Sequence, residues 1–147
     1  MTRKTIRYAG ALGLAVVSLA GCGGDDSSSD PNSANYDPAK TTLKDAGLEV
    51  CGEAQEQIPQ TLASGEGVTN SRAFFVAKDC KGKETSPNTI SVFQYDSLES
   101  VTAGTAKVKA AFPDAATLTK EPLIIVSTGP NKDENLAAVE KALPEGL

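Results

Sequence analysis

Residues 123–126 read Leu-Ile-Ile-Val, so none of these four positions offers a polar side chain to water. Successive side chains of a strand point to opposite faces of a sheet. The run therefore predicts a strand that is buried on both faces or lies at the centre of a sheet. Residues 71–80 and 89–95 are rich in aromatic and β-branched residues, which predicts two more strands paired as an antiparallel hairpin.

Helices are predicted on either side of these strands. Asp37 as N-cap and Pro38 at the first helical position indicate a short helix that ends at Gly47, and a strand begins at Leu48. Two later helices carry apolar residues at steps of three and four. Their inward stripes comprise Leu98, Val101, Thr105, Val108 and Phe112 in the first, and Leu136, Val139 and Leu143 in the second.

Two box-like caps are expected to begin the later helices, Asp96 with Glu99 and Asn131 with Glu134. Residues 52–70 contain proline and glycine breaks and are left unassigned. The predicted order is α-β-β-β-α-β-α, which favours an α+β fold: a small two-layer sandwich in which a mostly antiparallel sheet packs with two to three helices. Residues 37–147 are expected to form this single domain, since they are enough for one core and too few for two.

The start of the chain has the pattern of a secretory signal. Three basic residues lie among the first seven, and residues 8–20 carry no charge but are too few to span a membrane. The tetrapeptide Leu19-Ala20-Gly21-Cys22 resembles the lipobox of bacterial lipoproteins. The resemblance implies a signal peptide at residues 1–21, cleavage between Gly21 and Cys22, and a diacylglyceryl group on the Cys22 sulfur. An ordinary secretory signal is the alternative.

The implied lipid would place the protein on the extracytoplasmic face of the cell membrane. Each buried methylene of an acyl chain contributes about 0.8 kcal/mol, so two chains hold stably where one holds only marginally. Residues 22–36 are mostly small and polar, and we expect a disordered tether that reaches about 45–50 Å when extended. Cleavage would remove three basic residues and move the formal net charge from −5 to −8. A chain this acidic is a poor partner for nucleic acid.

Assigning Cys22 to the lipid leaves Cys51 and Cys80. An even number of cysteines in an exported protein predicts one disulfide. Two free buried thiols or a redox pair are the alternatives, although the close C-x-x-C spacing of a redox site is absent.

The chain has no histidine, which removes the commonest general base and the commonest metal ligand. It also has no calcium-loop motif, and we expect neither a cofactor nor a metal nor catalysis. Lys78, Lys81 and Lys83 form a small basic cluster around Cys80. A solvated loop is the ordinary interpretation, and a contact for an acidic partner is the specific hypothesis.

These features favour a membrane-anchored lipoprotein that acts as a non-catalytic interaction module, with an envelope protein as its partner. A small-ligand-binding lipoprotein is the second hypothesis, and a hydrolase built on carboxylates is the third.

Overall fold

The computed structural model describes residues 37–144 of the chain. The predicted signal peptide, the predicted tether and the last three residues lie outside this part. The elements, in chain order, are α1 (Pro38–Asp45), β1 (Glu49–Glu53), the 3-10 helix η1 (Gln55–Gln57), α2 (Gln60–Ala63), β2 (Val68–Ala77), β3 (Thr89–Tyr95), α3 (Leu98–Ala111), β4 (Ala116–Lys120), β5 (Leu123–Thr128) and α4 (Lys132–Ala142).

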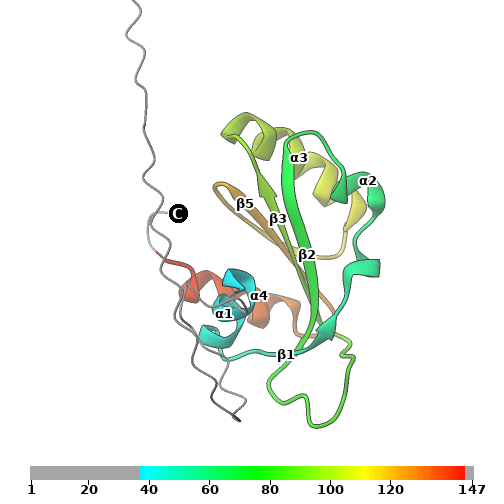
Figure 1. Cartoon of the computed structure of the whole chain (residues 1–147), viewed down its shortest axis with the longest axis vertical. Helices are drawn as coiled ribbons and strands as arrows, with labels where there is room; N and C mark the ends of the chain where they lie inside the picture. Colours follow the sequence, from blue (N-terminus) through cyan, green and yellow to red (C-terminus); the bar gives the residue numbers. More distant parts are fainter. Residues whose placement is uncertain (1–36, 145–147) are drawn as a thin grey trace, which may run out of the picture.

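The five strands form one antiparallel sheet in the order β1-β2-β3-β5-β4 (Figure 1). β2 and β3 make the predicted hairpin. β5 pairs with β3 on one side and β4 on the other, so the apolar run 123–126 lies inside the sheet, as its composition requires. The sequence did not indicate β4, because Ala-Thr-Leu-Thr-Lys is short and largely polar and becomes a strand through its pairing with β5.

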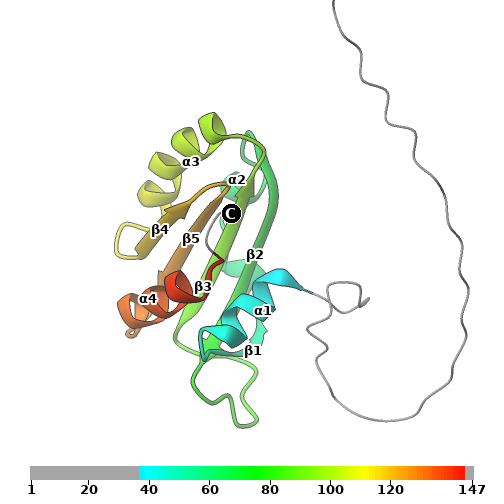
Figure 2. The same ribbon diagram turned by 90° about the vertical axis from the view of Figure 1, so that its left-hand side faces the viewer.

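Helices cover both faces of the sheet: α2 and α3 lie on one face, and α1 and α4 lie on the other (Figures 1 and 2). β5 supplies both cores, since Ile124 and Val126 join the cluster under α2 and α3, whereas Ile125 packs with Leu43 and Val139. The α+β class with an antiparallel sheet is confirmed. The arrangement differs from the expected two layers, because a strand that is apolar on both faces needs cover on both faces.

Local sequence patterns predicted the start of α1 correctly and misplaced the start of α3. α1 begins as predicted, with Asp37 Oδ1 accepting hydrogen bonds from the first turn, and Gly47 follows its end with a φ of +73°. The N-cap of α3 is Ser97, whose Oγ accepts from the Ser100 backbone N–H at 3.2 Å. The predicted Asp96 box is therefore wrong by one residue, because the Ser97 hydroxyl caps the helix through the N–H of Ser100, one position later than the Glu99 N–H that the box would use.

The predicted capping box is also absent at the start of α4, where Asn131 contacts a residue distant in sequence. The Asn131 side chain makes no cap hydrogen bond, and instead its backbone N–H donates to Asn88 Oδ1 at 2.9 Å. Glu134 pairs with Lys78 Nζ at 2.8 Å. Leu98, expected to face inward at the start of α3, is 58% exposed.

The predicted disulfide joins Cys51 in β1 to Cys80 just after β2, with the two Cα atoms 5.2 Å apart. It fastens the edge strand β1 to the hairpin. Residues 52–70, which the sequence left open, contain η1 and α2. Ile58 and Leu62 from this segment are buried in the core beneath α3.

Candidate functional site

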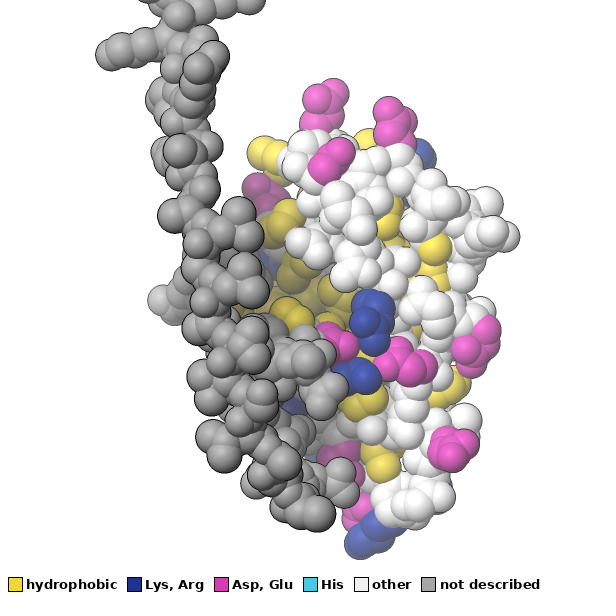
Figure 3. All heavy atoms as spheres, in the orientation of Figure 1, with side chains coloured by type: hydrophobic (Ala, Val, Ile, Leu, Met, Phe, Trp, Pro, Cys, Tyr) yellow, Lys and Arg dark blue, Asp and Glu magenta, His cyan; other side chains and the backbone are white. Residues whose placement is uncertain are grey.

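A groove opens on the sheet face that carries α1 and α4. Its volume is about 480 Å³, and its lining is mainly apolar. Figure 3 shows apolar side chains gathered in this hollow, with basic and acidic side chains at its right-hand lip. The apolar lining comprises Pro38, Ala39, Leu43, Ile90, Val92, Leu123, Ile125, Val139, Ala142, Leu143 and Pro144. We call this feature the sheet groove.

The strands build the floor of the sheet groove in rows, because alternate residues of each strand face the same side. In the innermost row, Phe74 of β2 lies opposite Ile90 of β3, and both are fully buried. In the middle row, Arg72 lies opposite Val92, which in turn lies opposite Ile125. Burial decreases from the innermost row outward, so the sheet groove is closed at the helices and open toward the far end of the strands.

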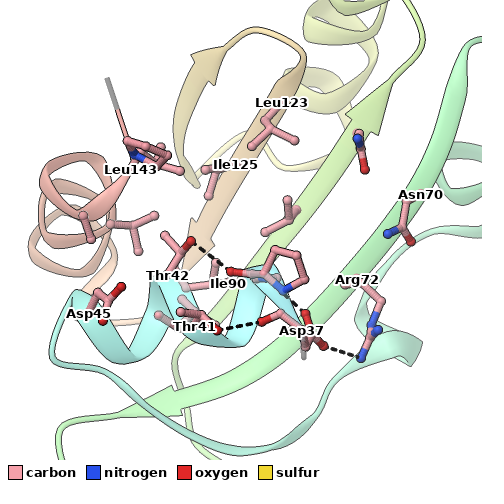
Figure 4. Close-up of a pocket in the computed structure, with 18 residues that line it drawn as sticks. Asp37, Thr41, Thr42, Asp45, Asn70, Arg72, Ile90, Leu123, Ile125 and Leu143 are labelled. Carbon is pink, nitrogen blue, oxygen red and sulfur yellow. Dashed lines mark hydrogen bonds and ion pairs between the residues drawn. The ribbon is translucent and has the colours of Figure 1, made fainter. Parts of the chain in front are cut away.

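The outermost row consists of Asn70 of β2, Gln94 of β3 and Leu123 of β5, which are neighbours across the sheet. Asn70 and Gln94 are exposed, and within residues 37–144 neither side-chain amide has a hydrogen-bond partner. Figure 4 shows Asn70, Arg72 and Leu123 at the rim around the apolar floor. The open end of the sheet groove therefore offers neutral donors and acceptors next to apolar surface.

Asp37 and Arg72 line one edge of the sheet groove, and Lys40 and Glu53 join them through ion pairs; these four side chains are here called the charged lip. Arg72 Nη2 lies 3.3 Å from Asp37 Oδ2 and 3.1 Å from Glu53 Oε1, while Lys40 Nζ lies 2.8 Å from Glu53 Oε1. The Arg72 guanidinium carbon is 5.3 Å from the centroid of the Phe74 ring, which is within cation–π range. Two acids and two bases thus balance, and the charged lip has no formal net charge.

The charged lip alters the titration of Glu53. Partial burial raises the pKa of this carboxyl, but the hydrogen bond and positive charge of Lys40, together with those of Arg72, hold the pKa below its ordinary value. Asp37 serves two elements at once, since Oδ1 caps α1 and Oδ2 pairs with Arg72 of β2 (Figure 4). This carboxylate therefore fixes the start of α1 to the sheet.

The three lysines predicted as a partner contact lie at the opposite end of β2, away from the sheet groove lining. Lys78 pairs with Glu134, and Lys81 Nζ lies 2.6 Å from Asp79 Oδ2. Lys83 is exposed, and its backbone N–H donates to the Cys80 carbonyl at 2.8 Å. Local acids thus neutralise part of the cluster, and its contact with an acidic partner stays a prediction.

The predicted lipidation site Cys22 and the cleavage site between Gly21 and Cys22 lie outside the described residues. Within residues 37–144, no helix is long and apolar enough to cross a membrane. The same part of the chain contains no group of three or more potential metal-ligating side chains.

A second hollow, of about 310 Å³, lies on the α3 side of the sheet and is lined by residues that include Tyr95, Glu99 and Lys107. Burial raises the pKa of Tyr95. A Cβ added at Gly104 would lie 2.4 Å from Tyr95 Oη, so the glycine allows α3 to pack closely on this ring. We interpret this hollow as the seam between α2 and α3.

Sequence reasoning did not find the sheet groove. Its residues come from both ends of the described chain and from three strands, and each has an ordinary local explanation as core, cap or surface. A signal was present in the alternation along β3, where Ile90, Val92 and Gln94 become progressively more polar.

Comparison of the chain with protein-family models, with curated proteins and with solved structures found no match.

Proposed function

We propose that this protein is a non-catalytic binding protein, held at the extracytoplasmic face of the cell membrane by a lipid on Cys22, with the sheet groove as its binding surface. The observation that carries the binding function is a hollow of about 480 Å³ with a mainly apolar lining, in which Val92 and Leu123 are partly exposed beside the buried Ile125. Leu98 of α3, which lies outside this lining, is the exposed large apolar side chain among the described residues. Concave, mainly apolar sites with a few polar groups at the rim are typical of ligand-binding proteins.

The size of the sheet groove favours a small ligand over a folded partner. Small-molecule sites measure about 300–1,000 Å³, and the volume here is about 480 Å³. The charged lip is internally paired, so its carboxylates Asp37 and Glu53 are occupied by Arg72. This occupation supports a binding role rather than the paired-carboxylate chemistry of a hydrolase.

The membrane part of the proposal rests on the resemblance of residues 19–22 to a lipobox. To test it, the full chain is expressed in a bacterium fed with labelled palmitate, alongside the variant Cys22→Ala. The wild type should carry the label and sediment with membranes, whereas the variant should carry none. A wild-type chain without label would contradict the proposed anchor.

The binding part is tested with Nile red, an uncharged dye that fluoresces in apolar surroundings. The mature chain with Cys22→Ser should bind the dye saturably. Val92→Phe should weaken binding, because the added ring occupies the floor. Thr119→Phe adds the same ring on the other face of the sheet, where Thr119 is exposed opposite Ile124, and serves as the matched control. Saturable binding that Val92→Phe leaves unchanged would refute the sheet groove as the binding surface.

A further inference from the structure

We infer that the sheet groove takes one hydrocarbon chain of an uncharged, hydroxyl-bearing membrane lipid, whose headgroup contacts Asn70 and Gln94. This inference rests on the proposed anchoring and binding function and adds the class of ligand. It follows from the apolar floor, from the neutral groups at the open end, and from the short stretch of sequence between Cys22 and Asp37.

The floor fits a hydrocarbon chain. Ile90, Val92 and Ile125 form a continuous apolar strip across β3 and β5, and Leu143 closes one side. The three rows of strand residues run from the buried end of the sheet groove, under α1 and α4, to its open end at Leu123. A volume of about 480 Å³ lies in the lower half of the small-molecule range, which favours one chain rather than two.

The open end favours an uncharged headgroup. Asn70 and Gln94 present one amide each, and an amide both donates and accepts, as a hydroxyl does. The charged lip has no formal net charge, and a further acid, Asp45, lines the sheet groove. An anionic headgroup would therefore meet acids without finding an unpaired base in the lining, and would lose its hydration on entry.

The short stretch of sequence between Cys22 and the sheet groove points to the membrane as the source of the ligand. Asp37, at the start of α1, lines the sheet groove. Fifteen residues separate the sheet groove from the end of the predicted signal, and a chain of that length spans at most about 50 Å. An anchor at Cys22 would thus hold the mouth of the sheet groove within this distance of the bilayer, where lipid is concentrated.

The experiment compares three single-chain probes with the same hydrocarbon chain: monooleoylglycerol, oleate and oleylamine. Each is titrated, below its aggregation concentration, into the mature chain with Cys22→Ser, and displacement of Nile red is followed at neutral pH. Monooleoylglycerol should displace the dye at a concentration at least about tenfold lower than either charged probe. The double variant Asn70→Ala/Gln94→Ala should weaken monooleoylglycerol about thirtyfold, since two hydrogen bonds of about 1 kcal/mol each are lost, with each displacement corrected for the dye affinity of the same variant.

The outcomes separate this inference from the proposed function. Dye binding with no preference for monooleoylglycerol, or a preference that survives the double variant, would overturn the headgroup assignment and leave the sheet groove as a binding site. Tighter binding of oleate or oleylamine would overturn the uncharged class in the same way. Absence of saturable dye binding would instead refute the proposed function itself.

Discussion

Asp37 offers the sharpest test of how the sheet groove is held together, because its two carboxylate oxygens have separate tasks. Oδ1 accepts from the backbone N–H of Ala39 at 3.1 Å and of Lys40 at 3.4 Å, which caps α1. Oδ2 pairs with Arg72. Asp37→Ala removes both interactions, whereas Asp37→Asn keeps a capping oxygen and removes only the charge.

The expected loss of unfolding free energy follows from the N-cap hydrogen bonds and the ion pair. Losing an N-cap costs about 1 kcal/mol of unfolding free energy. The ion pair adds at most about 0.5 kcal/mol, since the Arg72 side chain is 37% exposed and water screens it. Asp37→Ala should therefore destabilise the protein by about 1.5 kcal/mol, or roughly 6 °C in Tm. Asp37→Asn should lose about 0.5 kcal/mol, because Asn caps about as well as Asp.

Urea unfolding of the mature chain, followed by far-UV circular dichroism, measures both differences. A third variant, Arg72→Gln, and its double variant with Asp37→Asn isolate the ion pair, and their coupling energy should be about 0.5 kcal/mol. Equal losses for Asp37→Ala and Asp37→Asn would refute the capping argument. No loss for either variant would show that the start of α1 does not depend on this carboxylate.

Three further predictions concern the rest of the fold. Reducing the Cys51–Cys80 disulfide, which closes a span of 29 residues, should cost about 3–4 kcal/mol and lower the urea midpoint. Gly104→Ala should lower Tm despite better helix propensity, because the new methyl would collide with Tyr95; an unchanged or raised Tm would contradict the packing. The pKa of Glu53 lies below its ordinary 4.5 in the folded state, so its contribution is present above 4.5 and is lost as pH falls through the folded value. Glu53→Gln should therefore weaken the acid dependence of the urea midpoint between pH 7 and pH 3, and an identical dependence would count against the charged lip.

Local patterns predicted the elements whose hydrogen bonds and periodicity are contained in a short segment. The aromatic and β-branched composition of β2 and β3, the Asp37 cap and the inward stripe of α4 are each contained in a short segment, and all three elements are present. The predicted caps of α3 and α4 were wrong because other groups act there: Ser97 caps α3 through the Ser100 N–H, and Asn88 accepts from the Asn131 N–H at the start of α4. Competition between partners is decided by geometry that the sequence does not contain.

The class of the fold follows from local sequence pattern, because the apolar run 123–126 demands a buried strand and the flanking periodicities supply its helices. The disulfide was predicted on the premise that a lipid occupies Cys22, and the structure joins Cys51 to Cys80. The cover of helices on both faces of the sheet, and the part of one face that α1 and α4 leave open, follow from tertiary packing. The sheet groove exists because strand pairing brings the rows of β2, β3 and β5 into register, and register between distant segments follows from packing rather than from local pattern.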